Sequence, residues 1–345
     1  MTRRPQIANL PDGRRLHLQD GPIDLIVEAC GRPAEIEAAY GAAARRFEGM
    51  LDELCDELPL LRQAADPARC CLQGKVARRM HAAVASFAAD HFITPMAAVA
   101  GAVAEEILGA MLDATRLQRA YVNNGGDIAL YLGRGEHFRL GLMDRPDRHG
   151  VMQTSVIHAD DPARGIATSG RHGRSFSLGI ADAVTVLART ASQADAAATI
   201  IANAVDLPGH LAVLRCPAFH LQPDSDLGAR LVTRNVGALS QSEIKAALRA
   251  GAACARELLA AELITGAILR LHGENVTVAW RATGVTSPRL RGEVGLQSNP
   301  GEGLSPRVEL VERAPHPNHL PAKSGERGLT VGYREIDPNF FLSCE

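Results

Sequence analysis

The sequence is poor in aromatic residues and has no long hydrophobic run. Aromatics make up 4% of the 345 residues, whereas hydrophobic residues as a whole make up 46%, so small apolar residues such as alanine dominate the apolar part. The longest smooth apolar run, residues 96–104, ends at Glu105 and Glu106. A membrane-spanning helix needs about 20 such residues. We therefore expect a protein without a membrane segment or a membrane partner.

The chain also lacks a strong excess of charge. Its 37 Lys and Arg residues nearly balance 39 Asp and Glu residues, which leaves a formal net charge of −2. Proteins that bind nucleic acid carry basic patches, so we expect no nucleic-acid partner. The N-terminal stretch MTRRPQIANLPDGRR contains no apolar segment of the kind found in secretory signals.

Cysteine usage does not fit a disulfide framework or a zinc site. The number of cysteines is odd, no C-x-x-C motif occurs, and the neighbours Cys70 and Cys71 are awkwardly placed to pair with each other. This usage predicts a reducing compartment, and we expect a cytoplasmic protein. The seven cysteines are Cys30, Cys55, Cys70, Cys71, Cys216, Cys254 and Cys344.

The order of the predicted elements is mixed. Residues 14–31 predict two strands that meet at an Asp20-Gly21 turn, a dipeptide that favours a hairpin. Ser242 is the expected N-cap of the last helix. Because strands and helices do not alternate as in βαβ units, we predict an α+β fold rather than a doubly wound sheet. Apolar periodicity predicts helices over residues 34–54, 74–92, 95–114, 192–205 and 242–261.

The composition changes after Arg281. Residues 284–328 are rich in Pro, Gly, Arg and Ser and lack apolar periodicity, so they bury too little apolar surface to offset the entropy of ordering. We predict a folded body over residues 1–281 and a disordered C-terminal extension over 282–345. For the last stretch, 329–345, two interpretations stay open: a strand that docks on the body, or a sequence without a structural role.

A first candidate for chemistry is the stretch VNNGGDIAL, residues 122–130. One interpretation is a hairpin turn, because Asn124, Gly125 and Gly126 tolerate positive φ angles. The other is a close approach of the backbone to a ligand, with Asp127 binding a hydroxyl or amide group. On this stretch alone, the hairpin is the better-supported interpretation.

A second candidate is GIATSGRHGRSFSLG, residues 165–179. Hydroxyl groups and a bare glycine backbone precede two arginines and a histidine, which is the combination of donors that a phosphate group needs. A solvated loop with two surface arginines is an equally good interpretation. The candidate ligands are Thr168, Ser169, Gly170, Arg171, His172 and Arg174.

A third candidate is the small-residue helix SQADAAATIIANAV, residues 192–205. Asp195 and Thr199 are one turn apart and share a face. A carboxylate and a hydroxyl in this arrangement form half of a site for a hard cation such as Mg²⁺. Taken alone, the pair is better explained by an acidic residue near a helix N-terminus and a buried threonine.

Other acidic residues and the histidines carry less weight. Asp224 and Asp226 lie in a Pro/Gly loop, where Asp commonly forms Asx-turns. Glu105 and Glu106 are adjacent in a helix and therefore point to different faces. The 12 histidines show no HExxH or paired spacing.

Taken in order, these stretches resemble a known superfamily. The series PMAAVAGAVAEEI, VNNGGDI, ATSGR and AVTVLARTASQADAAATIIANAV lies within residues 12–281. It is similar to the ApbE-like superfamily, whose characterised members are Mg²⁺-dependent FAD:protein FMN transferases, and more closely to an uncharacterised cytoplasmic branch from bacteria and archaea. The resemblance implies a T-fold-related body of two similar α/β halves, with FAD or FMN bound between them.

The resemblance also implies roles for single residues. The family's GGD and TSG motifs are matched here, and its AD-x-x-(A/S)-T helix, which supplies Mg²⁺ ligands, is matched with Asp195 and Thr199 as the ligands. The residues expected to contact the flavin nucleotide are Asn124, Gly125, Gly126, Asp127, Thr168, Ser169, Gly170, Arg171 and Arg174.

The chain departs from the family in two places. The family's A-K-G reads Val99-Ala100-Gly101 and lacks the lysine, and its H-x-x-D-P-x-T-G loop is shortened to SFSLGIAD. Asp182 and His172 are the candidates to replace the missing catalytic pair. Three hypotheses follow: a Mg²⁺-dependent flavin or nucleotidyl transferase acting on an acceptor protein, a non-catalytic flavin-binding or delivery protein, or an enzyme for another small metabolite on the same scaffold.

Overall fold

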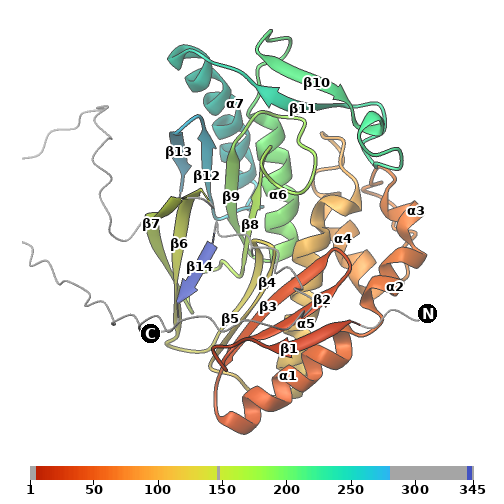
Figure 1. Ribbon diagram of the computed structural model, residues 1–345, viewed down its shortest axis with the longest axis vertical. Coiled ribbons are helices and arrows are strands. Elements are labelled where there is room, and N and C mark those ends of the chain that lie inside the picture. Colours follow the sequence, from red (N-terminus) through yellow and green to blue (C-terminus); the bar gives the residue numbers. More distant parts are fainter. Residues whose placement is uncertain (1–4, 146–147, 280–339, 344–345) are drawn as a thin grey trace, which may run out of the picture. The chain divides into compact units, whose positions relative to one another are not determined.

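The computed structural model describes residues 5–145, 148–279 and 340–343 and has the predicted α+β architecture (Figure 1). Its centre is a nine-stranded sheet in which every neighbouring pair is antiparallel. The strands, in their order across the sheet, are β1 (Gln6–Asn9), β2 (Leu16–Asp20), β3 (Ile23–Cys30), β4 (Arg119–Asn124), β5 (Asp127–Leu132), β8 (Gly165–Ser169), β9 (Ala183–Ala188), β12 (Gly266–Leu271) and β13 (Glu274–Val278).

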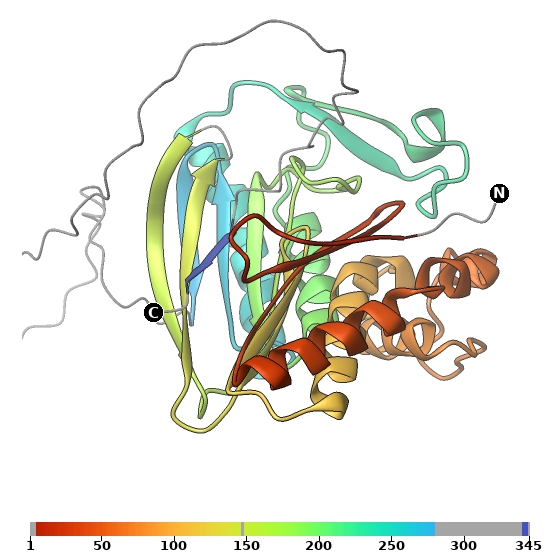
Figure 2. The ribbon, with the colours of Figure 1, turned by 60° about the horizontal axis from the view of Figure 1, so that its bottom comes forward.

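Helices cover one face of this sheet (Figure 2). Two of them are central: α5 contacts β4 and β5, and α6 contacts β8 and β9. Around this pair, α1 and α4 pack against α5, and α7 packs against α6. The helices are α1 (Pro33–Phe47), α2 (Met50–Asp56), α3 (Leu58–Leu61), α4 (Lys75–Ala85), α5 (Val99–Ala114), α6 (Ala191–Ala204) and α7 (Gln241–Ala260), and the 3₁₀ segment η1 (Pro95–Ala98) leads into α5.

The body consists of two similar halves, as the resemblance implies. In the first, the hairpin β2–β3 is followed by helices that end with α5 and then by the hairpin β4–β5. In the second, the hairpin β8–β9 is followed by α6 and α7 and then by the hairpin β12–β13. The pairing is equivalent, since β3 pairs with β4 and β9 pairs with β12. The halves join where β5 meets β8, through the residue pairs Ile128–Ile166 and Ala129–Gly165.

Two smaller sheets complete the described chain. One has the order β14-β6-β7 and contains β6 (His137–Arg145), β7 (Arg148–His158) and β14 (Phe340–Ser343). The other contains β10 (Val213–Pro217) and β11 (Leu231–Val236), with the 3₁₀ segment η2 (Ala218–His220) between them. The sequence did not predict β1, β7, β10 or β11.

The C-terminal extension was predicted with two alternatives for its last stretch. Residues Phe340–Ser343 pair with β6 in antiparallel register, which is the docked strand of the first alternative. The remainder of the predicted extension, residues 282–339 and 344–345, lies outside the described residues.

The stretch Pro95–Ala114 is long and apolar enough to cross a bilayer by length and composition. In the fold it forms η1 and α5, and Ala102, Val103 and Ile107 of α5 are fully buried in the core of the first half. A central helix of a folded core needs the same apolar composition, so the position of α5 accounts for it.

Three predicted helix boundaries are wrong, and two of them have a local reason. The helix predicted over residues 34–54 is two helices, because Gly49 adopts a φ of 79° between α1 and α2. The helix predicted over residues 74–92 ends at Ala85. In α7 the N-cap is Ser240, not Ser242: the Ser240 hydroxyl accepts a hydrogen bond from the Glu243 N–H, and the Glu243 carboxylate accepts one from the Ser240 N–H. This reciprocal pair is a capping box, which fixes the start of α7.

The close approach of α5 to α6 depends on small residues. A Cβ atom added to Gly101 of α5 would lie 2.3 Å from the carbonyl oxygen of Ala191 in α6, which is closer than atoms can approach. Along α6, six alanines are fully buried. The alanine-rich composition therefore lets the two central helices cross at backbone contact.

Replacing Gly101 with alanine should destabilise the protein. Because the added methyl group meets backbone that cannot rotate away, we expect the free energy of unfolding to fall by about 1–3 kcal/mol. Gly109 of the same helix is a matched control, since nothing lies within 4 Å of its added Cβ. Gly109→Ala should raise stability by up to about 1 kcal/mol through helix propensity. Urea unfolding of both variants checks this, and a Gly101→Ala protein as stable as the wild type would contradict it.

Candidate functional site

The crossing of α5 and α6 places two carboxylates at two helix N-termini. Asp195 of α6 accepts a hydrogen bond from the Gly101 N–H in the first turn of α5, at 3.1 Å. In return, Glu105 of α5 accepts hydrogen bonds from the Ser192 N–H at 2.6 Å and the Ser192 hydroxyl at 2.8 Å in the first turn of α6. Each carboxylate satisfies N–H groups that have no partner within their own helix. Glu105 was discounted in the sequence analysis, but it lies beside the candidate site.

Burial raises the pKa of Asp195 to about 7. Hydrogen bonds from the Gly101 and Ala100 N–H groups and the positive charge of Arg174 oppose this rise, whereas the charge of Glu105 adds to it. The residue nevertheless keeps some solvent access, being half-buried between fully buried alanines of α6. A carboxylate in this position is costly to ionise alone, so a cation beside it would be favoured.

The face of α6 that carries Asp195 is polar along three turns. Thr199 and Asn203 follow at i+4 and i+8, and all three side chains are half-buried. The Asn203 side-chain oxygen accepts a hydrogen bond from the Leu178 N–H at 3.0 Å. Within the described part of the chain, the structure gives the Thr199 hydroxyl no hydrogen bond. The helix geometry thus places Asp195 and Thr199 on one partly accessible face of α6, as predicted from their spacing.

The GGD stretch forms the predicted hairpin turn between β4 and β5. Gly125 and Gly126 have φ angles of 62° and 109°, and Asn124 pairs with Asp127 across the ladder. Two consecutive positive φ angles are typical of a type I′ turn and explain the two glycines. The Asp127 carboxylate accepts a hydrogen bond from the Thr168 N–H at 3.2 Å, which brings the GGD and TSG stretches together across the junction of the two halves.

Asn124 connects this turn to α5. Its side-chain NH₂ donates to the Ala100 carbonyl oxygen at 3.1 Å, which fixes the orientation of the amide group. The residue is 4% exposed, and its Oδ1 is buried without a hydrogen-bond partner among the described residues. An unpaired buried acceptor costs stability unless a ligand or water donates to it. The amide thus holds an acceptor oxygen that no group of the described chain satisfies.

The TSG stretch ends β8 beside this turn. The Thr168 hydroxyl shares a hydrogen bond with the Thr185 hydroxyl at 2.9 Å, and Ser169 is half-buried. Gly170 has a φ of 152°, and a Cβ there would lie 2.6 Å from the Asp182 carbonyl oxygen. A glycine is therefore required where β8 turns into the loop 171–182.

Asp182 anchors the loop 171–182 through hydrogen bonds of both its carboxylate oxygens. Arg171 donates to Asp182 Oδ1 through Nε at 2.9 Å and Nη2 at 2.6 Å, and the His172 ring lies 3.3 Å from the same oxygen. The other oxygen, Oδ2, accepts the His272 N–H at 2.6 Å. Both carboxylate oxygens are thus engaged by the protein, and Arg171 is committed to an ion pair. The catalytic roles expected for Asp182 and His172 stay predictions, and this geometry gives Asp182 a positioning function.

Arg174 differs from Arg171 in being exposed. Its guanidinium group lies over the Gly125 backbone, where an added Cβ would be 2.0 Å from Nη2, and Nη1 lies 3.4 Å from the Pro22 carbonyl oxygen. This places an exposed cation beside the β2–β3 turn and the β4–β5 turn, where its positive charge lowers the pKa of Asp195. Of the two arginines predicted to bind phosphate, Arg174 is the one whose donors are available.

The remaining acidic residues of the sequence analysis have structural partners. Asp224 forms an ion pair with Arg62 at 2.8 Å, and Asp226 accepts a hydrogen bond from the Thr94 hydroxyl at 2.5 Å. They therefore tie the 218–228 segment to the body, beyond the local turns that were expected. Glu106 is buried; although burial raises its pKa, hydrogen bonds from Arg46, Arg79 and Lys75 lower it to about 2.

No group of three or more His, Cys, Asp or Glu side chains in the described ranges is arranged to hold a metal ion. A cation at Asp195 and Thr199 would therefore take its other ligands from backbone oxygens, water or a bound phosphate, as Mg²⁺ commonly does. The residues present fit a Mg²⁺ ion held together with a nucleotide better than one held by protein alone.

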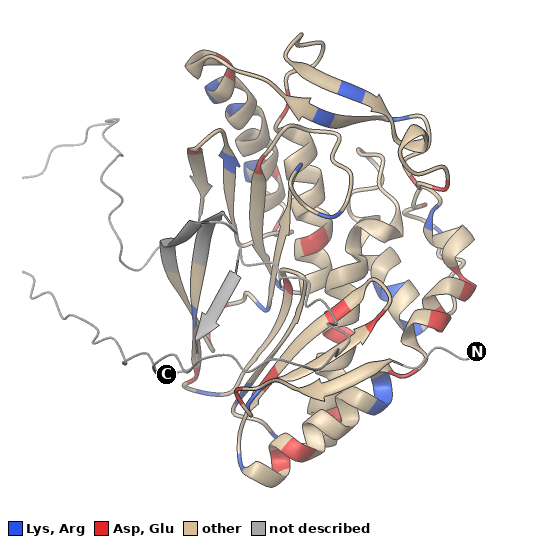
Figure 3. Ribbon diagram, in the orientation of Figure 1, with Lys and Arg blue, Asp and Glu red and all other residues tan. Residues whose placement is uncertain are grey.

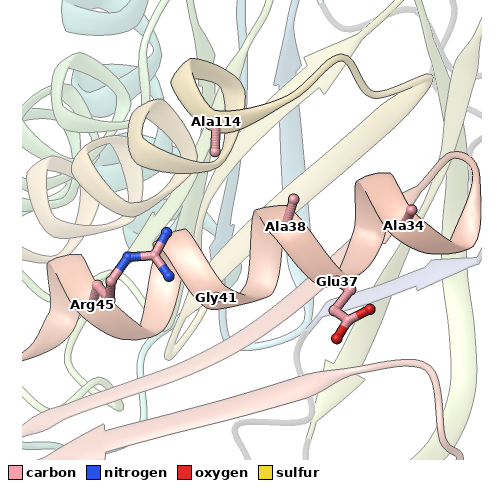
Figure 4. Close-up of a pocket in the computed structure, with 6 residues that line it drawn as sticks. All are labelled: Ala34, Glu37, Ala38, Gly41, Arg45 and Ala114. Carbon is pink, nitrogen blue, oxygen red and sulfur yellow. The ribbon is translucent and has the colours of Figure 1, made fainter.

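A groove elsewhere in the molecule is not part of this site. It lies between α1 and the end of α5 (Figure 4) and is lined by Ala34, Glu37, Ala38, Gly41, Arg45 and Ala114. Ala114 is 13 residues beyond Gly101 on α5, a separation of about 20 Å at 1.5 Å per residue. The groove is thus at the opposite end of α5 from Asp195.

The chain is similar to one protein family and to several individual proteins. A profile of the family described as "AbpE bacteria" matches residues 7–277. A UPF0280 protein of Methanococcoides burtonii is 36% identical over 170 residues, covering 46% of this chain and 65% of that protein, just under two thirds of its length. A UPF0280 protein of Methanopyrus kandleri is 36% identical over 183 residues, covering 52% of this chain and 69% of that protein. The crystal structure of Pseudomonas stutzeri flavinyl transferase ApbE in its apo form aligns with a TM-score of 0.43 and 13% identity, over 81% of this chain and 95% of that one.

Replacing Asp195 with asparagine should change how stability depends on pH. The folded pKa of about 7 lies above the ordinary carboxyl value of 3.8, so the folded state favours the protonated form. The resulting stabilisation is present below pH 3.8 and is lost as the pH rises through 7. Between about pH 5 and pH 8 the wild type should therefore lose stability relative to Asp195→Asn, whose amide does not ionise.

Unfolding free energies measured across this range check the prediction in the absence of divalent cations. Asp113→Asn, at an exposed position of α5, is the control and should follow the wild type at every pH. An Asp195→Asn curve parallel to the wild-type curve would show that this carboxyl is not destabilised by burial.

Proposed function

The chain belongs to the AbpE bacteria family, and from this membership we propose that it binds a flavin nucleotide, FAD or FMN, together with Mg²⁺. The proposed site lies between the two halves, at the first turns of α5 and α6, the β4–β5 turn and the start of the loop 171–182. The observation that carries the proposal is the half-buried Asp195, whose pKa is raised to about 7 and which shares an accessible helix face with Thr199.

A pyrophosphate group supplies what this site needs. Asp195 and Thr199 would hold a Mg²⁺ ion, which would offset the negative charge of Asp195 and of the phosphates and lower the pKa that burial has raised. Arg174 provides a charged donor on the other side. The glycines of the β4–β5 turn leave the backbone bare, so that a phosphate or a ring approaches without a clash.

Asn124 supports a nucleotide with a heterocyclic base or ring. Its Oδ1 is buried and unpaired within the described chain, while its NH₂ group is held by Ala100. Flavin and adenine rings both carry N–H donors. A donor from the ring would complete the hydrogen bonds of this amide, which gives the polar end of the ring a defined position.

The position of Asp182 bears on whether the bound nucleotide reacts. Its oxygens are occupied by Arg171, His172 and the His272 N–H, so the side chain is not free to take a proton without releasing the loop. FMN transfer from FAD to an acceptor protein is therefore one candidate function. Flavin binding or delivery without catalysis is the second, and the engagement of Asp182 favours it. None of the six described cysteines is part of a disulfide, which supports a reducing, cytoplasmic setting for either activity.

Two measurements test the proposal. Protein purified from cells should carry flavin absorbance, or bind added FAD in a titration that requires Mg²⁺. If AMP is then released from FAD when an acceptor protein is present, the protein is a transferase; FAD that stays intact identifies a carrier. Absence of any FAD, FMN or ADP binding with Mg²⁺ present would overturn the proposal.

Substitutions at the metal pair should weaken metal-dependent binding. Asp195→Asn removes the charge at constant shape, and Thr199→Val removes the second oxygen, so the affinity for Mg²⁺ in the presence of FAD or ADP should fall in both. In the wild type the affinity should rise as the pH increases through 7, because the cation binds the ionised carboxylate. Isothermal titration measures both effects. Unchanged Mg²⁺-dependent nucleotide binding in both variants would contradict the proposed metal site.

Arg174→Ala should weaken nucleotide binding as well. Loss of a charge-assisted donor costs about 1.5–3 kcal/mol, which corresponds to roughly a 10- to 150-fold rise in Kd. Arg134 is also exposed but follows β5 at the end of the strand opposite the β4–β5 turn, so Arg134→Ala should bind like the wild type. Arg171→Ala has a different expected effect, a looser loop and lower stability, because its partner is Asp182. Equal affinities of the Arg174→Ala and Arg134→Ala proteins would show that Arg174 is surface charge only.

A further inference from the structure

The segment between α6 and α7 reaches from the second half of the body to the first. This arm, residues 211–236, contains β10, η2 and β11 (Figure 1). Near its tip, Asp224 forms an ion pair with Arg62 at the end of α3. Asp226 accepts a hydrogen bond from the hydroxyl of Thr94, the residue before η1 and α5. The arm is therefore tied to the segment that leads into α5, on one side of the candidate site.

The arm also contacts the loop 171–182, which carries Arg174. The Thr233 N–H of β11 donates to the Ser177 carbonyl oxygen at 2.8 Å. Arg215 of β10 donates through Nη1 to the carbonyl oxygen of the next residue, Leu178. Two consecutive carbonyl groups of the loop are thus bound by the two strands of the arm.

Arg215 has a second partner that fixes its orientation. Its Nη2 donates to Asp206, and the two side chains are 16% and 20% exposed. Because a guanidinium group has a planar set of donors, it can bind a carboxylate and a carbonyl oxygen at the same time. Each strand of the arm carries one basic residue (Figure 3), but Arg234 of β11 is exposed and makes no hydrogen bond or ion pair within the described chain. Of the two, Arg215 is the arginine that connects the arm to the loop.

The loop is held from its other side by α6. The Leu178 N–H donates to the Asn203 side-chain oxygen at 3.0 Å, so this residue is bound through both its N–H and its carbonyl group. Residues 172–175, by contrast, are exposed, and they include Arg174. The position of Arg174 over the β4–β5 turn therefore depends on how the following part of the loop is held.

We propose that Arg215 is a positioning residue for the nucleotide site, because it holds the loop 171–182 where Arg174 lies over the β4–β5 turn. Arg215 acts through the Leu178 carbonyl group and does not touch the nucleotide. Asp206 has a share in this role, since it fixes the orientation of the Arg215 guanidinium group. The inference rests on the proposed nucleotide site and adds to it a residue that the site's own motifs do not contain.

The affinity for ADP in the presence of Mg²⁺ tests this role in a double-mutant cycle. Arg215→Ala should raise the Kd for ADP by roughly 5- to 10-fold, because Arg174 is no longer held near the bound phosphates. In a protein that already carries Arg174→Ala, the same substitution should change the Kd by less than about twofold, since the group that it positions is gone. Arg234→Ala is the matched control on the same arm and should bind ADP like the wild type.

Hydrogen exchange of the nucleotide-free protein gives a second readout. The Leu178 amide should exchange faster in Arg215→Ala than in the wild type or in Arg234→Ala, because the loop has lost one of its two anchors at this residue. Arg215→Lys is a milder second variant in case the alanine variant does not fold. It keeps the charge beside Asp206 but lacks the planar set of donors, so it should show the same two changes at a smaller size.

The outcomes distinguish this inference from the proposed function. A wild type that binds no ADP, FAD or FMN would overturn both. If the wild type binds ADP and Arg215→Ala binds it equally well, the positioning role is wrong and the nucleotide site stands. The same holds if Arg215→Ala weakens binding by the same factor with and without Arg174, or if it leaves the exchange of the Leu178 amide unchanged.

Discussion

The reciprocal capping of α5 and α6 is the constraint on which the rest of the described structure depends. Two helix N-termini meet at the centre of the molecule, and their positive ends would repel each other without compensation. Asp195 and Glu105 supply that compensation, each reaching into the first turn of the other helix. The contact requires Gly101 to touch the backbone of Ala191, so larger side chains are excluded from the crossing. The six fully buried alanines of α6 are consistent with this close contact.

The same crossing links the candidate site to the ionic network of the helical layer. Arg79 of α4 binds Glu105 at 3.2 Å and the buried Glu106 at 2.8 Å. Arg46 of α1 binds Glu106 in turn. The two adjacent glutamates, which point to different faces of α5, therefore have separate tasks. Glu106 joins the outer helices to α5, and Glu105 sets the start of α6 and adds negative charge near Asp195.

Features that depend on short-range spacing in the sequence were predicted correctly. The helix face of Asp195 and Thr199 follows from the i, i+4 rule, and the turn at Gly125-Gly126 follows from the need for positive φ angles. Glu105 was missed because its importance depends on which helix crosses α5, and nothing in the local pattern encodes the crossing. Asp182 could not be placed for the same reason, since one of its partners, His272, is 90 residues away. The ribbon β10–β11 was missed because its strands are short and their exposed faces lack the alternation that indicates a half-buried strand.

The junction between the two halves has a mechanical consequence. β5 and β8 share the residue pairs Ile128–Ile166 and Ala129–Gly165, a much shorter ladder than those within either half. The Asp127–Thr168 hydrogen bond and the α5–α6 contact supply the other ties across this seam. A force that separates the halves would therefore break the β5–β8 pairing before it breaks the longer strand ladders within either half. A ligand bound by residues from both halves would add contacts across the junction. The ligand-bound protein would therefore separate at a higher force than the ligand-free protein.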